Sequence, residues 1–328
     1  MKNYKRLYSL LLLGAFFLLF LGCKVNEEIR VIKLGHSLDI THPVHKSMLF
    51  MAKRLDEKSN GRMRIDIYPN QQLGSERECL ELLQIGSLGM TKVSTGVMEN
   101  FAPELKVFGL PFLFRDREHR FQVLEGKIGE DFLNSTIDKR LKGLTFYDAG
   151  SRSFYSKTPI EGPHDLKGLK LRVMESQTAI NMVKNLGGSP TPIAWGELYT
   201  ALQQGIVDGA ENNLPSFHLS RHYEVCKYLI LDEHTALPDE LVIGTPIWNQ
   251  LSPQEQKWLK ESAMESSEYE KEVWRKAELH ALEEIKKAGV TVIEAKKEEF
   301  RKLVKPMYDE FSLDSNMRSI IQEIQNIK

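Results

Sequence analysis

Two arginines lie close to the ends of predicted strands, where a cation could bind an anionic ligand. Arg172 falls in the run Leu169–Met174, in which strand alternation places apolar side chains on one face and Arg172 on the other. It comes near the carboxyl end of that strand, the edge at which open α/β sheets hold their ligands. Arg152 follows another predicted strand, Leu144–Tyr147. A guanidinium group can hold a carboxylate through two parallel hydrogen bonds, although most arginines are surface charges or members of ion pairs.

Polar and aromatic residues in the same half of the chain could complete such a site. Asn212 and Asn213 close the segment Asp208–Asn213, and an asparagine side chain can donate and accept hydrogen bonds at once. Trp195 could place an aromatic ring against the apolar face of a ligand. The alternatives are a simple turn at Asp208–Asn213 and a core position for Trp195.

The sequence carries none of the common catalytic motifs, so we expect no catalytic residues and no cofactor. A phosphate-binding Walker loop, a Gly-x-Ser-x-Gly elbow, a His-Glu-x-x-His pair and a dinucleotide fingerprint are all missing. His36, His42 and His45 could be imagined as a metal site, but no carboxylate or thiol at a fixed spacing completes it. We therefore expect no bound metal, and a metal-dependent hydrolase is the least favoured function.

The amino terminus has the pattern of an export signal. Lys2, Lys5 and Arg6 precede the apolar run Leu7–Leu21, which is too short for a comfortable membrane span. Phe20-Leu21-Gly22-Cys23 resembles a lipoprotein cleavage box, so residues 1–22 are predicted to be a signal peptide and Cys23 to be lipidated. A soluble periplasmic form is the alternative.

Charge and cysteine content narrow the possible partners. Removing residues 1–22 lowers Lys+Arg from 44 to 41 against 45 Asp+Glu, a net charge of −4. That balance argues against nucleic acid, which requires a basic face. Cys79 and Cys226 lie in different halves of the chain, and we expect two buried thiols rather than a bridge, although an oxidising compartment would permit one.

The elements that must position these residues alternate between strand and helix, which favours an α/β fold over two domains. The segments Glu78–Gly86 and Glu197–Gly205 align without gaps, each reading as a helix with a glycine stop before a short strand (Ser87–Val93 and Ile206–Ala210). Two similar lobes or chance likeness of two amphipathic helices would explain this. The other predicted strands are Val31–His36 and Met63–Tyr68, and the other predicted helices start at Pro43 or span Glu76–Ile85 and Ser176–Leu186.

The C-terminal third is predicted to contain one long helix. Ser252-Pro253-Gln254-Glu255 is a capping box, and no Gly or Pro follows until Gly289. About 36 residues at ~1.5 Å each would reach ~54 Å, which exceeds one small domain. Such a helix could brace two lobes, and a dimeric coiled coil is the alternative.

Several of these segments, taken together and in order, resemble the DctP-type solute-binding proteins of tripartite ATP-independent periplasmic (TRAP) transporters. The matching segments are Leu73–Glu76, Leu110–Phe114, Gly150–Arg152, Asp165–Met174 and Glu197–Asn213. The resemblance implies a two-lobed Venus-flytrap fold with a long C-terminal helix bridging both lobes. It also implies capture of an organic acid in the periplasm and delivery to integral-membrane permease subunits.

The resemblance further implies roles for individual residues. Arg172 matches the carboxylate-binding arginine of the family, Arg152 a second anion-binding arginine, Asn212 a polar contact, with Asn213 beside it, and Trp195 the aromatic position that lines the cleft. In the first lobe, His36 and Glu76 match places where the family gathers substrate hydroxyls.

The expected lobe limits are residues 23–149 with about 238–275 for the first lobe, and 150–237 with about 276–328 for the second. The segments Asn212–Phe217 and Arg221–Leu229, with Glu233-His234, are similar to the branch that binds hexuronates such as glucuronate or galacturonate. C4-dicarboxylates are the alternative ligands, and a structural or adhesion lipoprotein is an alternative of another class.

Overall fold

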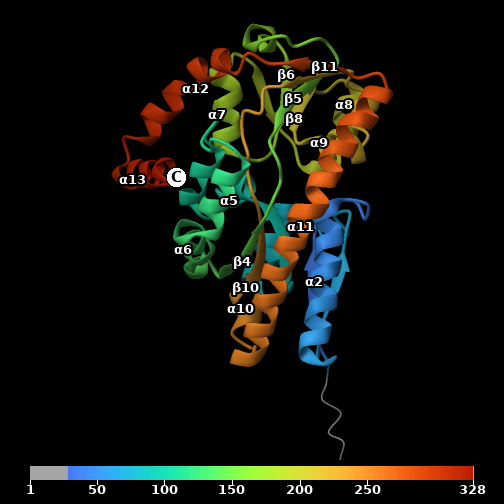
Figure 1. The fold of residues 1–328 in the computed structure, drawn as a ribbon, viewed down its shortest axis with the longest axis vertical. Coiled ribbons are helices and arrows are strands. Elements are labelled where there is room, and N and C mark those ends of the chain that lie inside the picture. Colours follow the sequence, from blue (N-terminus) through green and yellow to red (C-terminus); the bar gives the residue numbers. More distant parts are fainter. Residues whose placement is uncertain (1–28, 328) are drawn as a thin grey trace, which may run out of the picture.

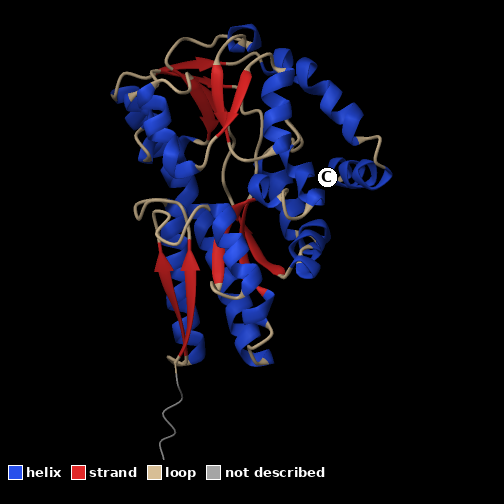
Figure 2. Cartoon of the chain, turned by 180° about the vertical axis from the view of Figure 1, so that it is seen from behind, coloured by secondary structure: helices blue, strands red, loops and turns tan. Residues whose placement is uncertain are grey.

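The computed structural model describes residues 29–327, and the predicted signal peptide and Cys23 lie outside this part of the chain. The chain forms two lobes stacked along its longest axis, each built on its own sheet (Figure 1, Figure 2). The predicted α/β class and two-lobed architecture are confirmed. No helix among residues 29–327 is both long and apolar enough to cross a membrane.

The sheet of the first lobe has the strand order β2-β1-β3-β10-β4. Its strands β1 and β2 run parallel to each other, β1 also pairs in parallel with β3, and β10 is antiparallel to both β3 and β4. The strand bounds are β1 Arg30–Gly35, β2 Met63–Tyr68, β3 Met90–Ser94, β4 Leu141–Tyr147 and β10 Asp239–Gly244. The helices of this part are α2 Pro43–Ser59, α3 Glu76–Ile85, α4 Thr95–Met98, η1 Pro103–Gly109, α5 Arg117–Glu125, α6 Lys127–Ser135, η2 Ile137–Lys139 and α10 Thr245–Trp248.

The sheet of the second lobe has the order β11-β9-β5-β8-β6-β7. Its strands are β5 Ser153–Ser156, β6 Lys170–Val173, β7 Ser189–Pro192, β8 Gly209–Asn212, β9 Tyr228–Leu231 and β11 Thr291–Glu294. The helices between them are η3 Pro163–Leu166, α7 Gln177–Asn185, η4 Trp195–Glu197, α8 Leu198–Gln204, α9 Leu214–Leu219 and η5 His222–Glu224.

One continuous helix, α11 Pro253–Lys287, connects the two lobes as the capping box and the absence of breakers predicted. The Ser252 side chain accepts a hydrogen bond from the Glu255 amide, and the Glu255 carboxylate accepts one from the Ser252 amide. These two reciprocal hydrogen bonds define where the helix begins. The helix packs along α2 and β4 of the first lobe and along α9 of the second (Figure 1). It therefore acts as the brace, and its buried face carries Trp274, Ala281 and Ile285.

The last two helices return the chain toward the first lobe. α12 Lys297–Phe311 packs on α7 of the second lobe, and α13 Ser315–Asn326 packs on η1 of the first (Figure 1). Cys79 and Cys226 are buried free thiols in two different apolar clusters, in agreement with the expectation for them.

Two predicted strands begin later than the sequence pattern suggested, for the same reason in both repeated segments. The predicted strand Ser87–Val93 is observed as β3 Met90–Ser94, and Ile206–Ala210 as β8 Gly209–Asn212. The residues after each glycine stop still bond to the preceding helix, because the Ser87 amide donates to the Leu82 carbonyl and the Ile206 amide to the Ala201 carbonyl. Gly86 and Gly205 adopt φ angles of 79° and 74°, so the two segments share this helix ending.

Candidate functional site

A cavity lies between the two lobes, and it gathers most of the residues that the sequence singled out. The cavity has a volume of about 70 Å³, enough for several water molecules. Six of the seven predicted ligand residues line it: Arg172, Arg152, Asn212, Asn213, Trp195 and Glu76. The wall also contains Ser37, His42, Lys92, Ser94, Met174, Glu175, Ser216, Asp239 and Trp274.

Arg172 is the cation of this cavity that lacks an acidic partner. It lies on β6, where it is in register with Ala210 of β8, and its side chain is buried. Its Nε donates to the Ile193 carbonyl at 2.8 Å, and its guanidinium carbon is 5.8 Å from the Trp195 ring centroid. Among residues 29–327 no carboxylate forms an ion pair with it, so four of the five guanidinium N–H donors remain for a ligand. Burial lowers the pKa of Arg172, with Glu211 opposing this effect and Arg152 adding to it.

Arg152, in contrast, is already paired inside the protein. Its Nη2 donates to the Glu211 side chain at 2.8 Å and to the Glu211 carbonyl at 2.9 Å, and its Nε also bonds to that carboxylate. Burial alone would raise the pKa of Glu211, but Arg152 and His234 hold it at about 2. His234 is buried between Asp232 and Glu211, and these carboxylates outweigh desolvation and raise its pKa to about 9. The charge of Arg152 is therefore largely neutralised before any ligand enters.

Asn212 and Asn213 use their amide oxygens within the protein. Asn212 Oδ1 accepts from Arg152 Nη1 and from the Asn213 backbone amide, both at 2.9 Å. Asn213 Oδ1 caps α9 by accepting from the Ser216 amide at 2.8 Å. The side-chain NH₂ groups are thus the parts of these two residues available as donors to a ligand.

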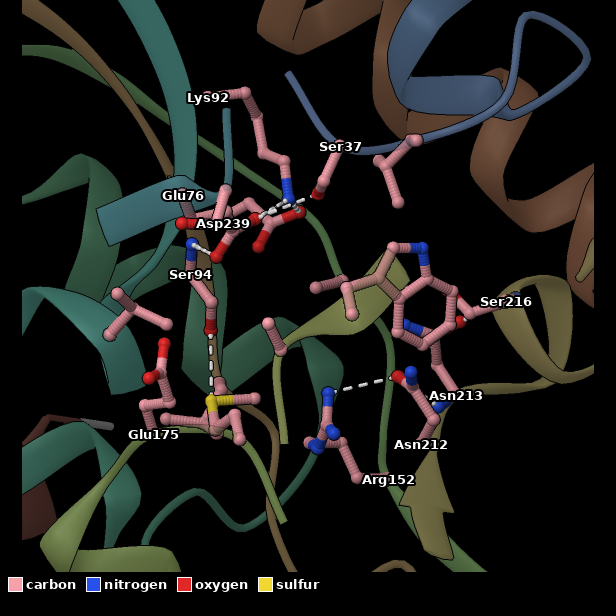
Figure 3. A pocket seen from close by; sticks show the side chains of 18 of the residues that line it. Ser37, Glu76, Lys92, Ser94, Arg152, Glu175, Asn212, Asn213, Ser216 and Asp239 are labelled. Carbon is pink, nitrogen blue, oxygen red and sulfur yellow. Dashed lines mark hydrogen bonds and ion pairs between the residues drawn. The ribbon is translucent and has the colours of Figure 1, made fainter. Parts of the chain in front are cut away.

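The first-lobe wall holds a cluster of three charged side chains. Lys92 Nζ of β3 lies 2.7 Å from Glu76 Oε1 at the start of α3 and 3.1 Å from Asp239 Oδ2 at the start of β10. Glu76 also accepts from the Ser94 amide at 3.1 Å. Figure 3 shows the side chains of Glu76, Lys92 and Asp239 together on one side of the cavity, opposite Arg152. The two carboxylates overcome desolvation and raise the pKa of Lys92.

Sequence reasoning identified Glu76 but missed Lys92 and Asp239. A lysine in a short strand without any other charged residue was the available signal, since a lysine that becomes buried requires partners. Its partner Asp239 could not be found from the sequence, because β10 pairs beside β3 from a distant part of the chain.

His36, predicted to contact the ligand, is not among the residues that line the cavity. Its Nε2 lies 2.9 Å from His45 Nδ1, and its Nδ1 accepts from the Leu38 amide at 3.1 Å. Burial, with contributions from His45 and Lys92, lowers the pKa of His36 to about 3. Both ring nitrogens are thus used by the protein, and the residue holds the loop that carries Ser37.

The lobes contact each other on both sides of the cavity, so the structure has the closed arrangement. On one side, His42 of the first lobe lies with Nε2 3.3 Å from Ser216 Oγ of the second. On the other, the Asn100 side chain donates to the Glu175 carbonyl at 2.6 Å, and Glu99 accepts from the Thr178 amide at 3.0 Å. A ligand in this cavity would be enclosed between the two walls.

The histidines near the cavity do not assemble a metal site. Residues 29–327 contain no group of three or more His, Cys, Asp or Glu side chains placed to hold a metal ion. Burial is the main reason that the pKa values of His42 and His45 lie below their ordinary value.

Comparison with known protein families agrees with the geometry of two lobes around an acid-binding cavity. Residues 34–314 match the family described as bacterial extracellular solute-binding protein, family 7 (DctP). The C4-dicarboxylate-binding periplasmic protein DctP of Rhodobacter capsulatus is 30% identical over 290 residues, which cover 86% of each chain.

Solved structures with the same fold contain sugar acids. A TRAP periplasmic solute-binding protein from Xanthobacter autotrophicus Py2 with bound β-D-galacturonate is 37% identical, with a TM-score of 0.88 over 90% of this chain and 100% of that one. The corresponding protein from Chromohalobacter salexigens DSM 3043, with bound D-glucuronate, is 32% identical with the same TM-score and the same coverage.

Proposed function

This chain belongs to family 7 of the bacterial extracellular solute-binding proteins and is a TRAP-transporter solute-binding protein, and from that premise we propose that its ligand is a hexuronate such as D-galacturonate or D-glucuronate. Proteins of this family are periplasmic receptors rather than enzymes. We further propose that the chain binds the acid by hinge closure, returns it chemically unchanged and delivers it to the membrane permease.

The observation that carries this proposal is the environment of Arg172. It is a buried cation on the cavity wall, and its Nη groups have no acceptor among the residues that the structure describes. A buried charge without a partner is unfavourable, so a carboxylate held by both Nη groups would stabilise the closed state.

The other lining residues support a ligand with several hydroxyl groups. Asn212 and Asn213 would donate from their NH₂ groups, and Arg152 would add its one N–H that the protein does not use. Trp195 would cover the apolar face of the sugar ring. Glu76 would accept from hydroxyls on the first-lobe side.

Closure follows from contacts that exist only when both lobes meet the ligand. An acid held by Arg172 in the second lobe and by Glu76 in the first would favour the closed state by the difference in its affinity for the two states. The segments that connect the lobes, together with α11, would absorb the movement.

C4-dicarboxylates are the second candidate ligands, favoured by the 30% identity to the Rhodobacter capsulatus protein. A hydrolase acting on a uronide would instead convert its ligand, which the recovery of unchanged ligand after incubation would exclude. A purely structural lipoprotein would show no ligand-dependent stabilisation.

We also propose a lipid anchor at Cys23 and limits for the two lobes. The pattern ending at Cys23 supports a lipid anchor in the periplasm. The working lobe limits are residues 23–149 with about 238–275, and 150–237 with about 276–328.

A thermal-shift screen of the mature protein tests the proposed ligand class. Uronates, aldonates, C4-dicarboxylates and keto acids would be compared at equal concentration, since a ligand that binds only the folded state raises the melting temperature. The largest shift is expected with a hexuronate, and no shift with any of these acids would refute the proposal.

A further inference from the structure

The charges that surround the cavity are unevenly distributed between its two walls. On the first-lobe wall, Lys92 is shared between two carboxylates, those of Glu76 and Asp239. Lys92 and Asp239 are buried and the Glu76 side chain is only 13% exposed, so solvent screens these charges incompletely. This wall therefore carries one negative charge in excess.

The second-lobe wall contains the one cation of the described lining that has no ion pair, Arg172. The Arg152 charge is matched by that of Glu211, through hydrogen bonds to both carboxylate oxygens. Arg172 is left with no ion pair among residues 29–327. Figure 3 shows Arg152 and Asn212 on this wall, opposite the cluster of Glu76, Lys92 and Asp239.

Adding the charges shows how many acid groups the cavity can neutralise. The cations Lys92, Arg152 and Arg172 face four carboxylates: Glu76, Asp239 and Glu175 on the lining and Glu211 beneath it. The site is thus already at a formal charge of −1 before a ligand binds. The Arg172 guanidinium can pair with one carboxylate of a ligand, and no second unpaired cation is found in the described lining.

A ligand that spans the cavity must place its other end against the first-lobe wall. A hydroxyl group can donate to Glu76 or Asp239 and accept from Lys92. A carboxylate at the same place can only accept, and it meets two like charges, of which Asp239 is buried. Burial already raises the pKa of Asp239, with Lys92 opposing and Glu76 adding to the shift, so another negative charge would act in the unfavourable direction.

On the basis of the proposed function, we infer that the cavity accepts a ligand with one carboxylate only. Glu76 and Asp239 are the specificity-determining residues, since they favour polyhydroxy monocarboxylates and exclude dicarboxylates. The carboxylate end of the ligand points to Arg172 and its hydroxyl end to the Glu76–Lys92–Asp239 cluster. Hexuronates would therefore be accepted and C4-dicarboxylates rejected.

Matched pairs of acids test this selectivity in isothermal titration calorimetry. D-gluconate and D-glucarate are both open-chain acids and differ at one terminal carbon, and D-galacturonate and galactarate provide a second pair. Wild-type protein is expected to bind each monoacid at least 100-fold more tightly than its diacid. Diacid binding is also expected to take up protons, measured in buffers of different ionisation enthalpy, whereas monoacid binding is not.

Two variants assign the effect to the first-lobe carboxylates. Asp239→Asn and Glu76→Gln keep the side-chain shape and remove one negative charge each. Each variant is expected to lower the ratio of monoacid affinity to diacid affinity at least tenfold. Glu81→Gln, on the exposed face of the same helix as Glu76, is the matched control and should leave the ratio unchanged.

The outcomes separate the inference from the proposed function. Equal affinity of wild-type protein for monoacids and diacids would overturn the inference and leave an acid receptor. If neither Asp239→Asn nor Glu76→Gln altered the ratio of monoacid to diacid affinity, the specificity roles of these residues would be overturned. If a variant did not fold, the proton uptake of wild-type protein on diacid binding would test the same roles. Binding of aldonates in preference to uronates, with diacids bound at least 100-fold more weakly, would refute the hexuronate assignment and support the inference, whereas no binding of any acid would overturn both.

Discussion

His42 and Ser216 meet across the cavity, with His42 Nε2 3.3 Å from Ser216 Oγ, and they belong to different lobes. His42 Nδ1 accepts from the Val44 amide, so Nε2 carries the proton and donates to the serine hydroxyl. The bond can exist only when the lobes are closed, and both residues are buried in that state. It therefore contributes to the closed state alone.

Ser216→Ala is expected to weaken ligand binding about fivefold, because a neutral hydrogen bond contributes roughly 1 kcal/mol. Calorimetry with a hexuronate, the proposed ligand, measures the change, and Ser220→Ala near the end of α9 is the control. In a His42→Ala background the same substitution should have almost no effect. A full loss in that background would mean that Ser216 acts on the ligand and not on the lobe contact.

Gly96→Ala is expected to hinder closure without touching the cavity charges. A Cβ at Gly96 would overlap with Met174 Sδ of the other lobe. Overpacking costs about 1–3 kcal/mol, and because the flexible Met174 side chain can give way in part, binding should weaken about fivefold, near the lower limit. Calorimetry would give the loss. In a Met174→Ala background, Gly96→Ala should cause little further loss of affinity, because the overlapping side chain is gone. Losses of affinity that simply add in the double variant would contradict the steric explanation.

Arg172→Ala should reduce affinity several hundred-fold, because it leaves the ligand carboxylate without its partner at a cost of about 3–5 kcal/mol. Arg172→Lys should recover part of the loss, since it keeps the charge but not the two parallel bonds. Titration calorimetry is the measurement, with the exposed Arg77→Ala as control. A loss of less than tenfold would refute the role of Arg172.

Glu240 makes stability depend on pH, because it is fully buried on β10 with neither carboxyl oxygen bonded within residues 29–327. Burial raises its pKa from the ordinary value of 4.5 to about 8, with Lys260 opposing. The folded state binds more protons between these values, so this group lowers stability as pH rises from about 4.5 to about 8.

Glu240→Gln should remove that dependence. Urea denaturation at pH 5, 7 and 9 should show a growing advantage of the variant over wild type, on the order of a few kcal/mol at the highest pH. Parallel stability curves for the two proteins would show that Glu240 is ionised at little cost.

The strand that carries Arg172 was predictable because its pattern is local. Alternation within Leu169–Met174 determines which face Arg172 occupies, and the glycine stops at Gly86 and Gly205 determine where two helices end. The long helix was also visible, since its capping box and lack of Gly or Pro lie within one continuous segment.

Relationships between distant segments were not predictable from one sequence. Arg152 meets Glu211 because β5 pairs antiparallel with β8. Arg152, which was predicted to bind the anionic ligand, therefore forms an ion pair within the protein. Lys92 meets Asp239 because β3 and β10 are neighbours. Periodicity reports which face a side chain occupies, and it carries no information on which strand lies opposite.

The position of β10 has a consequence for the order in which the molecule can be assembled. This strand lies between β3 and β4, yet it follows all the strands of the second lobe except β11 along the chain. Until residues 239–244 are available, β3 and β4 have no common neighbour, and the first sheet is split in two. Completion of the first sheet requires contacts between residues far apart in the sequence, and such contacts form slowly. We therefore expect that neither half of the chain folds separately and that the sheet is completed only when β10 inserts between β3 and β4.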